Sequence, residues 1–153
     1  MDSEELKELV REIVKEAEEL KDKHTDQKRA RVNYACIFSQ NKTEFEGLKG
    51  LAGKIGKIIE ETPTGPLFQI KLKTAAGELR LLKIRMPDRT RPERGDADFT
   101  VLNYSEFKEK FLSRKGFRLI KKREDFEMIE LMDIGFKVRV YFSNPPLDRQ
   151  LGI

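Results

Sequence analysis

The stretch SEFKEKFLSRKGFRLI, Ser105 to Ile120, decides the fold because it has a counterpart earlier in the chain. It predicts a helix with Ser105 as N-cap that ends at Gly116 and is followed directly by a strand. The earlier stretch TEFEGLKGLAGKIG, Thr43 to Gly56, predicts a similar helix with Thr43 as N-cap, and the strand KIIEE follows it. Two helices that open on Thr or Ser followed by Glu-Phe, and that stop at a glycine before a strand, indicate an internal repeat.

The segments around the two helices predict strands in the same order. Before the first helix lies the apolar, β-rich segment VNYACIF, and after KIIEE come LFQIKLKT and ELRLLKIRM, joined by the turn AAG. Before the second helix lies ADFTVLN, and after it come FRLIKK, FEMIELM and KVRVYF, with DIG in the place of AAG. In each half the last strand runs into a proline, at Pro87 and Pro145. The order β-α-β-β-β is therefore predicted twice.

The first residues predict an amphipathic helix outside the repeat. Apolar residues recur at three- and four-residue spacing between Leu6 and Leu20, and Asp2 with Glu5 predicts a capping box. The same positions trace about two heptads, fewer than the ~3–4 that indicate a coiled coil. We expect this helix to lie on the surface of its own domain, with a dimerisation helix as the alternative.

These patterns divide the chain into four parts. We expect an N-terminal helix and linker at 1–30, a first βαβββ module at 31–88, an inter-module linker at 89–96, and a second module with a C-terminal tail at 97–153. The prolines and mixed charges of the stretch RMPDRTRPERGDAD are typical of such a linker.

Composition limits the classes of function. The 153 residues include 31 Lys and Arg against 27 Asp and Glu, so the basic excess permits an acidic partner without requiring one. The single cysteine, Cys36, excludes an internal disulfide and suits a reducing compartment. No apolar run approaches the ~18 residues of a membrane span, and the N-terminus is too acidic for a signal peptide. We expect a cytoplasmic protein without a membrane partner.

A tandem βαβββ repeat of this size resembles the vicinal oxygen chelate superfamily, which includes glyoxalases, bleomycin-resistance proteins and extradiol dioxygenases. The similarity covers Val32 to about Pro146, and GDADFTV together with SEFKEKFLSRKGFRLI is its best local match. The resemblance implies an α+β fold in which two modules form a curved mixed sheet around a cavity, with helices on the outer face. The N-terminal amphipathic helix is an addition to that fold.

The resemblance also implies where metal ligands, typically His, Gln or Glu, would stand. The first-strand positions fall near Arg31 and on Asp96, and the last-strand positions fall on Leu81 and Arg139. Only Asp96 could bind a divalent ion, which needs about three suitable protein ligands. We therefore expect no metal and no other cofactor.

Strand alternation predicts which side chains face the cavity instead. The expected ligand-binding residues are Lys71, Lys83, Arg85, Asp98, Glu130, Arg139 and Tyr141. This set is polar and net basic, so it predicts a small anionic ligand, such as a phosphate, a carboxylate or a nucleotide. The alternative is an exposed sheet face whose charges meet only water.

Cys36 is expected on the opposite face of its strand, buried under the helix together with Tyr34 and Phe38. No His or Asp next to Cys36 in the sequence indicates a nucleophile. No motif predicts a particular reaction, so the sequence does not decide whether the protein is an enzyme.

A second hypothesis is a nucleic-acid module, for RNA in particular, or a protein-interaction module. It would use the N-terminal helix, the basic runs KDKHTDQKRAR and KKR, and the arginines Arg85, Arg89, Arg91 and Arg94. No stacking aromatic lies among these arginines, and nearby acids cancel much of their charge. A third hypothesis is an interaction subunit that forms a homodimer through the N-terminal helix or an edge strand.

Overall fold

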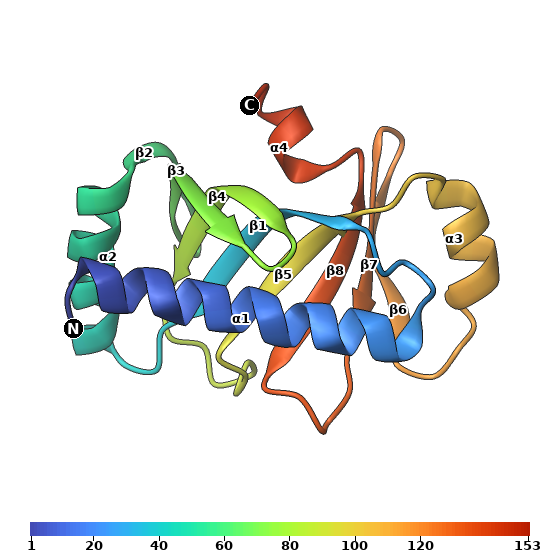
Figure 1. Ribbon diagram of the computed structural model, residues 1–153, viewed down its shortest axis with the longest axis horizontal. Coiled ribbons are helices and arrows are strands. Elements are labelled where there is room, and N and C mark those ends of the chain that lie inside the picture. The colour runs from blue at the N-terminus through green and yellow to red at the C-terminus, as the bar shows by residue number, and fades with distance from the viewer.

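The computed structural model describes residues Met1 to Ile153 and contains four helices and eight strands (Figure 1). The helices are α1 Ser3–His24, α2 Lys42–Ile55, α3 Tyr104–Phe111 and α4 Leu147–Gln150. The strands are β1 Arg31–Phe38, β2 Lys57–Thr62, β3 Gly65–Thr74, β4 Gly77–Arg85, β5 Gly95–Thr100, β6 Phe117–Arg123, β7 Phe126–Leu131 and β8 Val138–Asn144. All the strands expected from the sequence are present, and only the short α4 is not expected. None of the helices is long and apolar enough to span a membrane.

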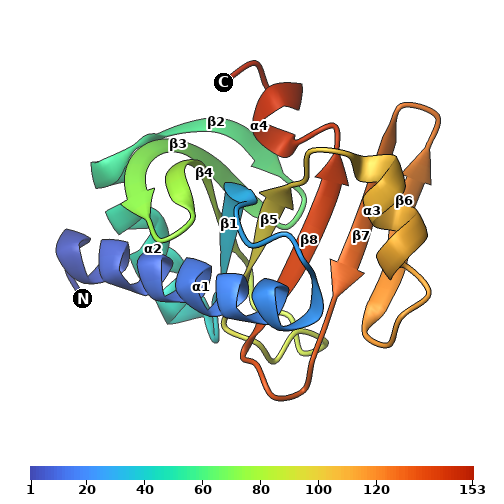
Figure 2. The ribbon, with the colours of Figure 1, turned by 45° about the vertical axis from the view of Figure 1, so that its right-hand side comes forward.

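The eight strands form one curved sheet that does not close into a barrel (Figure 2). Their order is β2-β3-β4-β1-β5-β8-β7-β6. In the centre β1 and β5 pair antiparallel, and each has a parallel neighbour on its other side, β4 and β8 respectively. From β1 to β4 and from β5 to β8 the elements follow the order β-α-β-β-β. The predicted α+β fold is confirmed, whereas the limits of the two modules stay a prediction.

Helices α1, α2 and α3 cover one face of the sheet (Figures 1 and 2). In Figure 1, α1 crosses the middle of the sheet, while α2 and α3 lie toward its two ends. The predicted capping box of Asp2 and Glu5 is present at the N-terminus of α1. The buried face of α1 joins the same core as Ile37, Ala97 and Val140. This helix therefore packs on its own domain, as expected, and its apolar face is already buried within the chain.

Both short helices begin two residues earlier than predicted, so the assignment of Thr43 and Ser105 as N-caps is wrong. The N-caps are Asn41 and Asn103, whose side chains accept hydrogen bonds from the backbone N–H groups of the glutamates three residues later. Asn is as good an N-cap as Ser or Thr, because its side-chain oxygen satisfies the same free N–H groups.

A β-bulge in β1 changes which side chains face the helices. The pairing of β1 with β5 shifts register between Val32 and Tyr34, so the alternation of faces is interrupted there. Val32, Ala35 and Ile37 belong to the core under α1. The prediction that Tyr34, Cys36 and Phe38 lie under the helix is therefore wrong, and they face the other side of the sheet.

Gly95, the first residue of β5, permits the close packing of three elements. A Cβ atom at this position would lie 2.2 Å from the carbonyl oxygen of Cys36 on β1 and 3.0 Å from Cδ1 of Ile13 on α1. A backbone oxygen cannot move away without disturbing the sheet. The absence of a side chain at Gly95 therefore lets α1 lie directly on the β1–β5 pair.

The packing of α1 predicts how much a smaller side chain in its buried face lowers the stability of the protein. Ile13→Ala, at a position that is 3% exposed, should lower the free energy of unfolding by about 2–5 kcal/mol, because it removes buried methyl groups and leaves a cavity. Lys15→Ala, on the exposed side of the same helix, should change it by less than about 0.5 kcal/mol. Urea unfolding measures both. If Ile13→Ala were as stable as Lys15→Ala, α1 would not be part of the cooperative core.

Candidate functional site

The face of the sheet opposite α1, α2 and α3 carries a concentration of polar side chains at its centre. We call it the polar face, and define it by Tyr34, Cys36, Lys83, Arg85, Asp96, Asp98, Glu130, Arg139 and Tyr141. Strand pairing aligns Lys83, Cys36, Asp96 and Arg139 in one row across β4, β1, β5 and β8. Directly opposite residues of neighbouring strands point to the same side of a sheet. The four central strands therefore place these groups side by side.

Asp96 is a buried carboxylic acid at the centre of this row. It is 5% exposed, and its Oδ1 atom accepts no hydrogen bond from the protein. Burial raises the pKa of Asp96 to about 7, with the positive charge of Arg91 opposing the rise and the negative charge of Asp98 adding to it. Near neutral pH this carboxyl group therefore exists in both the protonated and the ionised form.

Asp98, two residues further along β5, is buried but hydrogen-bonded. Asn33 Nδ2 donates to its Oδ1 over 3.0 Å, and the backbone N–H and the hydroxyl of Ser143 also donate to this carboxylate. Burial raises the pKa of Asp98 to about 6, and the hydrogen bonds from Ser143 and Asn33 oppose the rise. Asp98 is thus held in place by its neighbours, whereas Asp96 has a free acceptor.

On β4, the cations Lys83 and Arg85 both lie close enough to Asp96 to lower its pKa by their charge. Both are half-buried. Lys83 forms no ion pair, and burial lowers its pKa. Arg85 pairs weakly with Asp88 over 3.4 Å, and its buried Nε atom has no hydrogen-bond partner. A buried donor or acceptor without a partner costs about 1–3 kcal/mol, so these atoms favour a ligand that can reach them.

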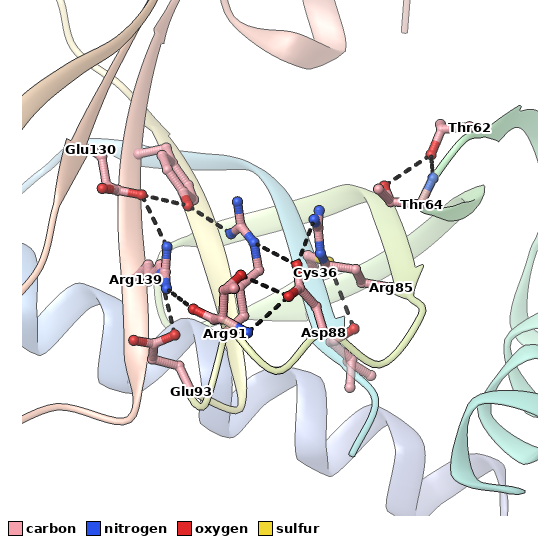
Figure 3. Close-up of polar contacts among 12 residues, drawn as sticks. Cys36, Thr62, Thr64, Arg85, Asp88, Arg91, Glu93, Glu130 and Arg139 are labelled. Atoms are coloured by element: carbon pink, nitrogen blue, oxygen red, sulfur yellow. Dashed lines mark hydrogen bonds and ion pairs between the residues drawn. The ribbon is translucent and has the colours of Figure 1, made fainter. Parts of the chain in front are cut away.

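A third predicted cation, Arg139, is fully engaged within the protein. Its Nε lies 2.9 Å from Oε1 of Glu93, and its Nη1 lies 3.3 Å from Oε2 of Glu130. Glu130 also accepts a hydrogen bond from the hydroxyl of Tyr141 over 3.0 Å. Figure 3 shows this network on the β8 side of the polar face, with Arg85 and Asp88 at the other side. Arg139 is therefore structural, and a ligand would have to displace two carboxylates to use it.

The segment between β4 and β5 closes over the polar face. Arg91 donates from Nη1 to the hydroxyl of Tyr141 over 3.1 Å, and its guanidinium lies 5.4 Å from the ring centre of Phe38. Arg94 forms a two-point ion pair with Glu44 on α2, at 2.7 and 3.1 Å. Only Arg89 of the three linker arginines is exposed. Two of the three linker arginines therefore form contacts within the chain, and their guanidinium groups are less available to bind nucleic acid.

The structure brings together all of the predicted ligand-binding residues except Lys71. Lys71 is exposed on β3. The residue of β3 that pairs with Lys83 is Leu67, so Lys71 lies further along the strand and away from Lys83. Tyr34 and Cys36 were not expected on this face, because the bulge in β1 leaves no signal in the pattern of apolar residues. Cys36 is 1% exposed, and burial raises the pKa of its thiol well above its usual value. It is a buried neutral thiol rather than a nucleophile.

The residues that the superfamily resemblance assigns to metal positions do not fit a divalent metal ion. Arg31, Leu81 and Arg139 offer no ligand atoms that such an ion accepts. Asp96 supplies one carboxylate, and the nearest charged side chains around it include cations that would repel a metal. No group of three or more His, Cys, Asp or Glu residues in the chain is placed to hold a metal ion.

Comparisons with known proteins concern the fold alone. No protein-family model and no curated protein matches the sequence. A solved structure described as "Structural Genomics, Protein EC4020" is similar with a TM-score of 0.69 at 12% identity, over 93% of this chain and 86% of that chain. A glyoxalase/bleomycin resistance protein/dioxygenase superfamily member from Vibrio splendidus 12B01 is similar with a TM-score of 0.47 at 8% identity, over 74% of this chain and 97% of that chain. At these identities the first similarity shows a shared fold, and we base no argument on the second.

The raised pKa of Asp96 predicts how stability depends on pH. The folded state keeps the Asp96 proton up to about pH 7, whereas the unfolded state loses it near pH 3.8, so ionisation makes folding less favourable as pH rises through this window. Asp96→Asn removes this contribution. Between pH 4.5 and pH 8 the free energy of unfolding of the variant, relative to the wild type, should rise by up to about 3 kcal/mol, from ~1.4 kcal/mol per pKa unit.

Urea unfolding at the two pH values measures this difference, and the comparison with the wild type cancels the titration of other groups. The groups that surround Asp96 are Asp98 on β5, Tyr34 and Cys36 on β1, Lys83 and Arg85 on β4, Arg139 and Tyr141 on β8, and Arg91 of the preceding segment. A difference that stays constant with pH would mean that Asp96 is ionised throughout the window.

Proposed function

We propose that this chain binds a small anionic molecule, with a carboxylate or phosphate group, on the polar face. The observation that supports this most is the unpaired ammonium of Lys83 beside the unpartnered Nε of Arg85 and the unpartnered Oδ1 of Asp96. Three polar groups from β4 and β5, without partners of their own, are complementary to a ligand that carries both negative charge and hydrogen-bonding oxygens.

The position of the two cations suits this role. Lys83 and Arg85 are two residues apart on β4, so they project from the same face of the strand. Because both are half-buried, their attraction to an anion is screened less by water and salt than that of a surface lysine. The guanidinium of Arg85 can also bind a carboxylate or a phosphate through two parallel hydrogen bonds.

Asp96 supports anion binding only in its protonated form. A protonated carboxyl group donates a hydrogen bond to a ligand oxygen, whereas an ionised one repels the ligand. Its pKa of about 7 allows the proton to be present when the anion binds. A bound anion stabilises the protonated form further, because binding and protonation are thermodynamically linked.

The proposal predicts a specific loss of affinity in one variant. Among phosphates, nucleotides and carboxylates tested by thermal shift and calorimetry, at least one should raise the melting temperature of the wild type. Lys83→Gln should weaken the binding of that compound at least about tenfold, since a hydrogen bond to a charged group is worth ~1.5–3 kcal/mol. Lys71→Gln removes the same charge from an exposed site and should leave the affinity within about twofold.

Two results would count against this function. If none of these compounds raised the melting temperature, the polar face would be a structural ion-pair network only. If a compound bound equally well to the wild type and to Lys83→Gln, it would bind elsewhere on the chain.

The role of Asp96 predicts that affinity depends on pH. For a ligand whose own groups do not titrate, such as a sulfate, affinity should increase as pH falls from 8 to 6, because Asp96 gains its proton near pH 7. Asp96→Asn, which is always neutral and keeps a donor, should bind with an affinity that is nearly constant over this range. Calorimetry at several pH values measures both proteins, and an equally steep dependence in the variant would exclude Asp96 as the titrating group.

A further inference from the structure

A second concentration of positive charge lines a groove at one end of the central strands, away from the polar face. The groove has a volume of about 980 Å³. Its lining comes from the α1–β1 connection, the beginnings of β1 and β4, the end of β5, and the C-terminal segment around α4, which contacts β1. We call it the basic groove, after its five cationic side chains, Lys28, Arg29, Arg31, Arg80 and Arg149.

Four of these cations have no carboxylate partner in the chain. Arg80 pairs with Glu78 over 3.2 Å, whereas Lys28, Arg29, Arg31 and Arg149 form no ion pair and are exposed. Of the remaining acids of the groove, Asp26 pairs with Lys110, which lies outside the groove. Asp148 accepts only the neutral backbone N–H of Arg149 and keeps its negative charge, but the four free cations outnumber it. The free charge of the groove is therefore positive.

The groove is formed before any partner binds, because hydrogen bonds to the adjacent residue Gln27 hold the segment that carries Lys28 and Arg29. Lys21 is fully buried, and its ammonium donates to the carbonyl oxygen of Gln27 over 2.7 Å. The backbone N–H of Gln27 donates to Thr25 Oγ1 over 3.0 Å. On the neighbouring wall, the guanidinium of Arg31 packs against Gly77 at the β3–β4 turn. The contact is so close that a Cβ atom added to Gly77 would lie 3.1 Å from Nε of Arg31. A preformed groove loses little conformational entropy on binding.

From these observations we propose that the basic groove binds the sugar–phosphate backbone of single-stranded nucleic acid. Arginine guanidinium groups bind phosphate oxygens in pairs, and arginines predominate among the cations of the groove. A single strand is flexible enough to follow a recess, whereas the phosphates of a duplex or of a lipid surface lie on a convex or flat front that cannot enter one. The lining contains no aromatic residue, so bases would not be stacked and binding would be tolerant of sequence.

A peptide is a poorer occupant of the same groove. The edge strands of the sheet are β2 and β6, and neither contributes to the groove, so an extended peptide could not add to the sheet through main-chain hydrogen bonds. Electrostatic contacts to phosphates alone are enough for sequence-independent binding of nucleic acid. The linker arginines that the sequence suggested for this role lie in another part of the chain and are mostly engaged within it.

The test measures the binding of a fluorescent twelve-nucleotide oligothymidine to the full chain by anisotropy at 50–200 mM salt. With four unpaired cations, the slope of log K against log salt concentration should be about −3, from ~0.7 per phosphate neutralised. The variant Arg29→Gln, Arg31→Gln, Arg149→Gln should reduce this slope by about 2 and weaken binding more than about tenfold at 50 mM salt.

A matched variant removes the same charge elsewhere, from exposed residues that form no ion pair: Lys54→Gln, Lys57→Gln, Lys71→Gln. It should keep its affinity for the oligonucleotide within about threefold. Thermal unfolding confirms that both variants are folded, and if the groove variant is not, Lys28→Gln with Arg29→Gln in the connecting segment replaces it and should lower the slope by about 1.4.

Three outcomes would overturn the proposal. The first is no binding of the oligonucleotide by the wild type at 50 mM salt. The second is an equal loss of affinity in the groove variant and the matched variant, which would show unspecific attraction by net charge. The third is binding of polyglutamate, duplex DNA or anionic vesicles as tight as that of the single strand, since the groove would then not select this class of partner.

Discussion

The antiparallel pairing of β1 with β5 is the interaction on which the rest of the structure depends. It joins the two halves of the sheet, and Gly95 keeps it thin enough for Ile13 of α1 to pack directly against it. On one side the pair is covered by apolar side chains of α1. On the other side it carries Cys36 opposite Asp96, in the row that continues to Lys83 and Arg139. The same two strands therefore provide the hydrophobic core and the centre of the candidate site.

The polar face combines a half whose charges are paired within the chain with a half whose polar groups lack partners. Around β8, Arg139 is held by Glu93 and Glu130, and each buried charge there has a partner of opposite sign. Around β4, Lys83 and Arg85 have fewer partners than they can bind. Buried charges that lack partners destabilise a fold, and proteins tend to keep such groups where function requires them. This contrast locates the proposed anion site, although the sheet continues without a break between the two halves.

The fold could be predicted from the sequence because apolar periodicity, turn glycines and the Asp2–Glu5 capping box each leave a local signal. The faces of β5 and β8 followed from alternation, so Asp98 and Arg139 were assigned to the polar face correctly. The bulge in β1 reversed the assignment of Cys36, because one extra residue in a strand changes every face that follows it. The engagement of Arg91 and Arg94 depends on partners about fifty residues away in the chain, which no local pattern reports. The sequence therefore predicted where the polar face lies, but not that Cys36 belongs to it or that Arg91 contacts it.

The position of α1 has a consequence for how the chain acquires its structure. Its apolar side is made early in synthesis, but one of the strands that it packs against, β8, begins only at Val138. Contacts between segments so far apart in the chain form late, since a long loop must close first. Until β8 is available, part of the apolar stripe of α1 remains open to water or to a chaperone. Folding of this protein is therefore expected to be completed from its C-terminal half, with the first helix among the last elements to be fully buried.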